Sequence, residues 1–127
     1  MPSNMSFSHT TEQIINRTKT VTRRLGWKHL KPGEQFWAVR KTMGLKPGEQ
    51  VERLELLECV SNTREPLNAI TEADVEREGF PGKTADWFMS MFRCIGARDS
   101  AHPRCGYDEE VSRIEFEYVP CGNLRKP

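Results

Sequence analysis

One hexapeptide occurs twice in this chain, and it constrains the fold more than any other feature. Leu-Lys-Pro-Gly-Glu-Gln stands at residues 30–35 and again at residues 45–50. In each copy the Pro-Gly pair suits the centre of a type II turn, because proline fixes φ and glycine accepts a positive φ. Each copy precedes a strand-like run, at 36–39 and at 51–60. The repeat therefore predicts one kind of turn that is used twice to enter adjacent strands.

Three short segments have the form of helices that begin at a threonine. Thr10 is followed by Gln13 and two isoleucines, Thr71 leads an acidic segment that stops before Gly79, and Thr84 leads the third segment. A threonine in this position can cap the first free backbone N–H groups. The third segment carries large apolar residues at the spacing of one helix face, which predicts packing in the core: Trp87, Phe88, Met91 and Phe92.

The end of the chain alternates apolar and acidic residues over 114–118, which is typical of a half-buried strand. Strands are thus expected from both halves of the chain, with helices between them. This order predicts an α+β fold with a small mixed or antiparallel barrel-like sheet. We expect a single domain over residues 1–119 and a disordered tail over residues 120–127, which has little to hold it.

Positive charge is concentrated near the start of the chain. No acidic residue occurs from Gln13 to Gly33, although the whole chain has 19 basic and 18 acidic residues. This window contains Arg17, Lys19, Arg23, Arg24, Lys28 and Lys31. Such a patch favours a phosphate-bearing ligand, whereas a net charge of +1 argues against indiscriminate coating of nucleic acid. The alternative is a solvated face whose acidic partners come from elsewhere in the fold.

The cysteines do not have the paired spacing of a strong zinc motif. Weak candidate ligands are Cys94, His102, Cys105 and Cys121, while Cys59 lies in an apolar stretch and is expected in the core. No cofactor is predicted. The start of the chain lacks the apolar stretch of a secretory signal, and no apolar run approaches the length of a membrane span. A cytoplasmic protein without membrane contact is the expectation.

Several segments together resemble an ASCH domain, which has the PUA-like fold. They are the run from Ile14 through Lys-Thr-Val-Thr-Arg-Arg, the Leu-Lys-Pro-Gly-Glu turn before a strand, the acidic helix at 71–78 and the closing strand at 113–116. The resemblance spans about residues 7–119. It implies a small β-barrel flanked by short helices, with a groove that accepts a nucleoside, a nucleotide or single-stranded RNA.

A branch of small enzymes in this family hydrolyses the amide of N4-acetylcytidine with a Lys, a Thr three residues later and a Glu on the following acidic helix. The matching positions are Lys19, Thr22 and Glu78. The resemblance implies that these three are catalytic. The basic run itself predicts that Arg17, Arg23, Arg24 and Lys28 bind nucleic acid or phosphate.

This chemistry sets requirements that a structure can test. A threonine hydroxyl needs a base to take its proton, and a lysine serves as that base only when its pKa is lowered by burial or by neighbouring cations. Glu78 could orient the ammonium group or pass a proton to the leaving amine. Residues three apart in a regular strand point to opposite faces, so Lys19 and Thr22 can cooperate only across a helix end, a turn or a bulge.

Two other functions remain open at the level of sequence. The same groove could belong to a non-catalytic RNA-binding regulatory module, or to a ribonuclease, although the chain lacks a paired-histidine arrangement for acid–base cleavage of RNA. Each residue also has a purely structural interpretation. Lys19 and Thr22 could be an exposed pair at the start of a strand, and Glu78 could bridge to Arg77 or Arg64.

Overall fold

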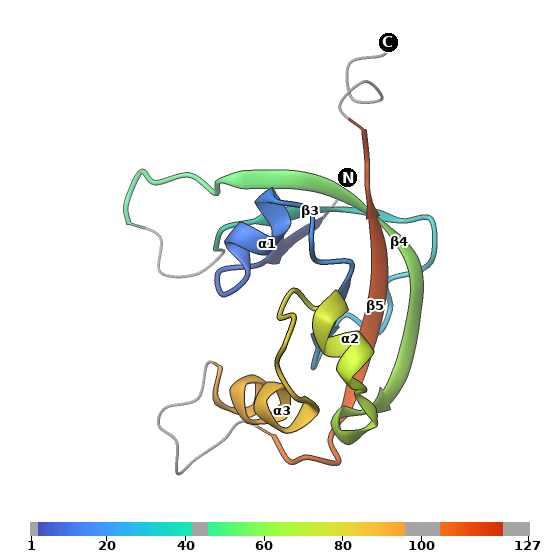
Figure 1. The fold of residues 1–127 in the computed structure, drawn as a ribbon. Coiled ribbons are helices and arrows are strands. Elements are labelled where there is room, and N and C mark those ends of the chain that lie inside the picture. The colour runs from blue at the N-terminus through green and yellow to red at the C-terminus, as the bar shows by residue number, and fades with distance from the viewer. Residues whose placement is uncertain (1–2, 42–45, 96–104, 121–127) are drawn as a thin grey trace.

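The computed structural model describes residues 3–41, 46–95 and 105–120 (Figure 1). Its five strands are β1 (Ser3–Ser6), β2 (Val21–Arg24), β3 (Gln35–Val39), β4 (Arg53–Pro66) and β5 (Glu110–Tyr118). Its helices are α1 (Thr11–Ile15), α2 (Glu72–Arg77) and α3 (Ala85–Cys94), with the 3-10 turn η1 (Leu67–Ala69) after β4. None of these helices has the length and apolar character needed to cross a membrane.

The strands form one curled sheet in the order β1-β3-β4-β5-β2 (Figure 1). β1 runs parallel to β3, and the other neighbouring strands are antiparallel. The long strand β4 pairs with both β3 and β5, and its pairing shifts between Cys59 and Ser61. The sheet is therefore an incomplete barrel whose two edges are β1 and β2. The α+β prediction with a mixed barrel-like sheet is confirmed.

The repeated hexapeptide forms the predicted turn twice. Glu34 N donates to Lys31 O over 3.0 Å in the first copy, and Glu49 N donates to Lys46 O over 2.9 Å in the second. Gly33 and Gly48 have φ values of 90° and 82°, as a type II turn requires. The turns precede β3 and β4, which are adjacent in the sheet. The second strand is longer than predicted because β4 continues to Pro66.

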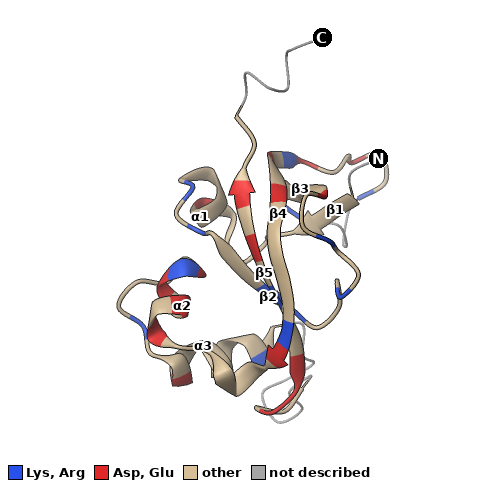
Figure 2. Ribbon diagram, turned by 90° about the vertical axis from the view of Figure 1, so that its right-hand side faces the viewer, with Lys and Arg blue, Asp and Glu red and all other residues tan. Residues whose placement is uncertain are grey.

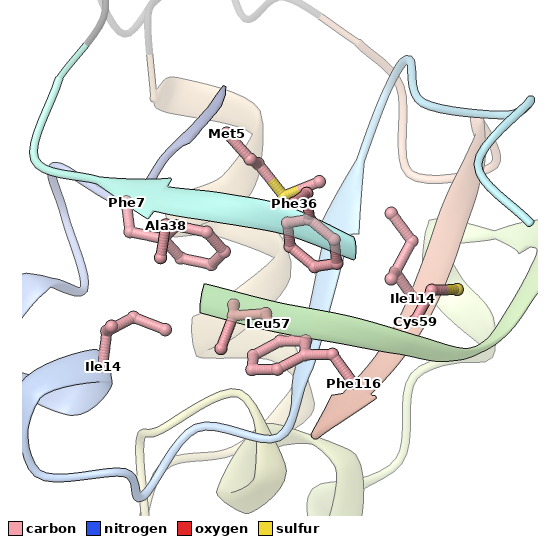
Figure 3. Packing of buried hydrophobic residues seen from close by; sticks show 9 residues of the cluster. All are labelled: Met5, Phe7, Ile14, Phe36, Ala38, Leu57, Cys59, Ile114 and Phe116. Carbon is pink, nitrogen blue, oxygen red and sulfur yellow. The ribbon is translucent and has the colours of Figure 1, made fainter. Parts of the chain in front are cut away.

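Two apolar clusters fill the interior. The larger one lies inside the curl of the sheet and contains Met5, Phe7, Ile14, Phe36, Ala38, Leu57, Cys59, Ile114 and Phe116 (Figure 3). Its aromatic rings meet edge to face, with 6.2 Å between the centroids of Phe7 and Phe116 and 6.0 Å between those of Phe36 and Phe116. The second cluster joins α3 to η1, α2 and β5, and includes Leu67, Val75, Phe88, Phe92 and Val111. Cys59 is buried, as predicted.

The helices correct two details of the sequence analysis. Thr10 stands at the N-cap of α1 but its side chain caps nothing, whereas Thr71 and Thr84 accept the predicted bonds from Asp74 N and Trp87 N. The buried face of α3 consists of Phe88, Met89 and Phe92. Met91 is only partly buried, and Trp87 is 36% exposed, so the core stripe lies about one residue further along than predicted.

Strand β1 was not predicted. Its residues, Ser-Asn-Met-Ser, have low strand propensity apart from Met5, and its parallel partner β3 lies some thirty residues away in the sequence. The predicted tail beyond residue 120 falls outside the described residues.

Candidate functional site

Lys19 and Glu78 form an ion pair inside the protein. Lys19 Nζ donates to Glu78 Oε1 over 2.7 Å and to the Glu78 carbonyl oxygen over 2.9 Å. The two side chains are 3% and 2% exposed. Taking two charges out of water costs free energy even when they are paired and hydrogen-bonded. The rest of the fold must therefore offset the free energy of desolvating this pair. The interpretation of Lys19 as an exposed residue at a strand entrance is therefore wrong.

Lys19 lies before β2, in the irregular link that follows α1. The backbone N–H groups of Thr18 and Lys19 both donate to Gln13 O, and Tyr118 Oη donates to Lys19 O over 2.6 Å. Thr22 lies within β2 itself. Because Lys19 is outside the strand, strand alternation does not send it away from Thr22. The structure thus brings both side chains into one pocket in the way that the sequence analysis required.

Glu78 is positioned by the end of α2. It is the C-cap residue of this helix, and Gly79 follows with a φ of 106°. Gly79 also lies directly against α1, since Gln13 Nε2 donates to Gly79 O over 3.3 Å. A β-carbon at Gly79 would stand 2.6 Å from Gln13 Cγ. Glycine is therefore needed here both for the backbone conformation and for the close approach of the two helices.

A layer of charged side chains continues beneath this pair, and we call it the charged layer. Its members come from α2 and its C-cap, from β2 and β5, and from the link between α1 and β2: Lys19, Arg23, Asp74, Glu78 and Arg113. Arg23 donates to Glu78 Oε2 over 3.0 Å, to Asp74 Oδ2 over 2.7 Å and to Glu65 Oε2 over 2.9 Å. Arg113 donates to both oxygens of Asp74 over 3.0 Å. Glu78 is thus shared between Lys19 and Arg23.

Burial and pairing shift the proton affinities of this layer. Burial lowers the pKa of Lys19, against the opposing effect of Glu78, and Arg24 and Arg23 lower it further. Hydrogen bonds from Arg113 and then from Arg23 hold the pKa of Asp74 well below its usual range. For Arg23, burial acts to lower the pKa, but Glu78, Asp74 and Glu65 together raise it. The pKa of Lys19 is therefore shifted in the direction that favours a general base.

The Lys19–Glu78 pair forms part of the wall of a cavity of about 410 Å³, which we call the Lys19 pocket. Its polar residues include Lys19, Thr22, Arg23, Arg24 and Glu78, and an apolar wall is formed by Phe80, Phe88, Met91 and Phe92. This volume is within the range of small-molecule sites.

Arg24 connects the polar wall to the core. Its Nε donates to Thr22 Oγ1 over 3.1 Å, and its guanidinium lies over the Phe7 ring, 4.6 Å from the centroid. The Thr22 hydroxyl therefore accepts a charge-assisted hydrogen bond, and its own proton stays available to another group.

The predicted phosphate-binding residues do not form one basic groove. Arg17 is paired with Glu55 over 3.2 Å and lies over the Tyr118 ring. Arg23 is fully buried among three carboxylates, so the prediction that it meets phosphate at a surface is not supported. Arg24 lines the Lys19 pocket, whereas Lys28 lines a different pocket. Basic and acidic segments are mixed over the molecule (Figure 2).

Among the described residues, no group of three or more potential ligands could hold a metal ion. Of the weak zinc candidates, His102 and Cys121 fall outside the described residues, Cys94 is exposed and Cys105 is buried.

Sequence reasoning also missed part of the Lys19 pocket. The segment from Ser6 to Thr10 lines one side of it and includes His9. The cluster of small polar residues around His9 was the available signal, but without β1 there was no reason to place it beside Lys19.

Comparisons with known proteins support the fold. No family model matches the sequence, and no curated protein is significantly similar to it. A DUF984 protein from Enterococcus faecalis V583 has a TM-score of 0.65 and 16% identity, over 94% of this chain and 76% of that chain. An ASCH domain from Lactobacillus crispatus JV V101 has a TM-score of 0.64 and 15% identity, over 91% and 78%. The chain therefore has the fold of an ASCH domain.

Proposed function

Given the ASCH-type fold, we propose that the Lys19 pocket binds a cytosine nucleoside and hydrolyses the amide of an N4-acyl group on its base. The observation that carries this proposal is the buried ion pair of Lys19 and Glu78 in the same pocket as the Thr22 hydroxyl. A buried lysine with a lowered pKa, placed with a hydroxyl in a cavity, is a typical arrangement for activating a nucleophile. The apolar wall opposite suits a planar base.

The proposed reaction has two halves. In the first, neutral Lys19 takes the Thr22 proton while Thr22 Oγ bonds to the acyl carbon. The carbon–nitrogen bond then breaks, and the proton passes from Lys19 to the leaving N4 amine, which leaves an ester on Thr22. In the second, water attacks this ester with Lys19 taking its proton, the carboxylic acid departs, and the proton returns to Thr22 Oγ.

The other charged groups have supporting roles in this proposal. Glu78 holds the Lys19 amine in place through both a carboxylate oxygen and a backbone carbonyl. Arg24 donates to Thr22 Oγ1, so it would favour negative charge on that oxygen. Arg23 bonds to the other carboxylate oxygen of Glu78 and so helps to fix the partner of Lys19.

The dispersal of the basic run favours this proposal over a regulatory module that reads phosphates. A phosphate-reading groove needs several cations on one accessible surface. Here Lys19 and Arg23 are buried, and Arg17 is paired with Glu55. A ribonuclease is disfavoured for the same reason.

The experiment is an acetate-release assay with N4-acetylcytidine, the free base, the nucleotide and cytidine acylated with larger groups. We expect acetate release by the wild-type protein with weak dependence on salt. Thr22→Ala and Lys19→Ala should each abolish turnover, because a nucleophile and its base fail together. Thr22→Ser keeps the hydroxyl and should retain activity.

Arg24→Ala is the matched control for charge. It removes one cation from the same pocket, and it should lower turnover only in part, because Arg24 contacts the Thr22 hydroxyl without being its base. Equal and salt-dependent losses of affinity from Lys19→Ala and Arg24→Ala, with Thr22→Ala silent, would refute the hydrolase and support a binding module.

A further inference from the structure

The backbone of Lys19 is fixed by a side chain from the far end of the chain. Its N–H group donates to Gln13 O over 3.4 Å, within the link between α1 and β2. Its carbonyl oxygen accepts a much shorter bond, of 2.6 Å, from the hydroxyl of Tyr118, which is 99 residues away in the sequence. Tyr118 is the last residue of β5. The end of the sheet therefore holds the peptide group from which the Lys19 side chain extends.

The same link contains a strained residue. Arg17 has a φ of 59°, in the left-handed region that favours glycine. It directly follows the C-cap residue of α1, where glycine is the commonest residue in helices that end in this way. Such strain persists only where the surrounding contacts enforce it. We therefore expect the side chain of Arg17 to make contacts that glycine could not make.

The guanidinium of Arg17 joins two other elements of the fold. Its Nη2 donates to Glu55 Oε1 of β4 over 3.2 Å, and its Cζ lies over the Tyr118 ring, 5.5 Å from the centroid. Glu55 precedes Leu57 by two residues in the strand, so it is on the inner face of the sheet, where a carboxylate needs a partner. The ring of Phe116 meets that of Tyr118 edge to face, with 5.7 Å between the centroids. The tyrosine ring is thus fixed both by the guanidinium and by the core.

The Tyr118 hydroxyl keeps its proton and lies away from the ligand cavity. Burial, and then Glu55, raise the pKa of Tyr118, against the effects of Arg17 and of the bond to Lys19 O. Tyr118 lies outside the lining of the Lys19 pocket. Any effect that Tyr118 has on a ligand there must therefore pass through the position of Lys19.

We propose that Tyr118 is a positioning residue for the Lys19 amine, and that Arg17 and Glu55 hold the Tyr118 ring for this role. The bond to Lys19 O fixes the backbone so that Nζ reaches both of its acceptors on Glu78. Placement matters because a displacement of about 1 Å can slow a reaction by about 100-fold. This inference rests on the proposed function, since it concerns the base of that reaction.

The kinetic test uses Tyr118→Phe, which keeps the ring and removes only the hydroxyl. In the acetate-release assay, kcat should fall by about 10- to 100-fold with KM unchanged, because Lys19 moves while the rest of the pocket lining stays in place. Tyr107→Phe is the matched control. It removes the other tyrosine hydroxyl of the chain, from a residue that is 46% exposed and outside the pocket lining, and it should keep the wild-type kcat.

Arg17→Asn tests how the tyrosine ring is held. Asparagine tolerates a positive φ, so the variant should fold, but its short side chain loses the contacts of the guanidinium. Its kcat should fall less than that of Tyr118→Phe. Because Arg17 acts through Tyr118, the double variant should have the kcat of Tyr118→Phe alone. Losses that multiply in the double variant would contradict this part of the inference.

A second measurement does not depend on turnover. In protein made with isotope-labelled lysine, the NMR signal of Lys19 Cε is identified by its absence from Lys19→Ala. Tyr118→Phe should shift this signal, and Tyr107→Phe should not. An unchanged Lys19 signal in Tyr118→Phe would overturn the inference, whatever the value of kcat. A wild-type protein that releases no acetate would instead refute the proposed hydrolysis, and a shifted Lys19 signal in Tyr118→Phe would still support the positioning of the amine.

Discussion

The apolar cluster inside the curled sheet and the charged layer under α2 are both buried, but different interactions stabilise them. The apolar cluster gains free energy from every side chain taken out of water, and its contacts have no required direction. The charged layer gains only when each charge finds its partner at hydrogen-bond distance, because an unpaired buried charge is destabilising. The first region therefore responds to lost volume, and the second to a lost partner.

The largest effect is expected in the apolar cluster. Phe116 is buried and contacts the rings of both Phe7 and Phe36. Phe116→Ala should lower the free energy of unfolding by about 3–5 kcal/mol, as measured by urea denaturation. Phe116→Leu, which keeps most of the volume, should cost clearly less. If both variants were equally unstable, volume would not be what this region responds to.

A smaller effect with no change of volume is expected in the charged layer. Asp74→Asn keeps the shape of the side chain but removes the charge that Arg23 and Arg113 share. We expect a loss of about 1.5–3 kcal/mol in the free energy of unfolding, the usual value for a hydrogen bond to a charged group. Glu76→Gln is the matched control, because Glu76 is exposed on the same helix. Equal free energies of unfolding for the two variants would show that the charged layer does not depend on the charge of Asp74.

The two regions should also differ in their response to acid. The folded pKa of Asp74 is lowered, so the unfolded chain takes up its proton first as the pH falls. The stability that Asp74 contributes is complete above the ordinary carboxyl pKa of about 4 and is lost as the pH falls towards the folded pKa. Thermal melts below about pH 4 should therefore be less pH-dependent in Asp74→Asn than in the wild type. Phe116→Leu should keep the wild-type pH dependence.

The smallest effect is a shift of the pH profile of kcat/KM towards lower pH. Burial lowers the pKa of Lys19, and only its neutral form can accept the Thr22 proton. If the proposed hydrolysis is correct, kcat/KM should rise with pH and level off at a pH below the ordinary lysine pKa of about 10.4. A profile that continued to rise up to this ordinary value would contradict the role of Lys19 as the base.

The same contrast explains what the sequence could predict. Turn chemistry is local, so the Pro-Gly turns before β3 and β4 were predictable, and the alternation in β5 was too. Strand β1 was not, because a polar tetrapeptide becomes a strand only through its distant parallel partner. Apolar periodicity predicted the position of α3 but not which of its faces is buried. Trp87 packs against Phe80 and is partly exposed, whereas Met89 is buried.

For the site, the resemblance to the family named Lys19, Thr22 and Glu78, and the structure brings them together. The environment of the cations was not predictable from their spacing. Lys19, Arg23 and Arg24 are equivalent in the sequence as members of one basic run. In the structure, Lys19 and Arg23 are buried, and they are paired with carboxylates of residues in or next to α2 and β4. Only the tertiary fold decides which cations are neutralised inside and which face a pocket.

The contact between Gly79 and Gln13 has a consequence for how this sequence can change over time. Any side chain at position 79 would collide with Gln13 and would also require a backbone conformation that only glycine adopts easily. Random substitutions at 79 should therefore be lost from a mutational library selected for folding, whatever the selection for activity. At position 13, by contrast, smaller residues should be accepted. The residue next to Glu78 is thus fixed by its neighbour in space and not by the ligand.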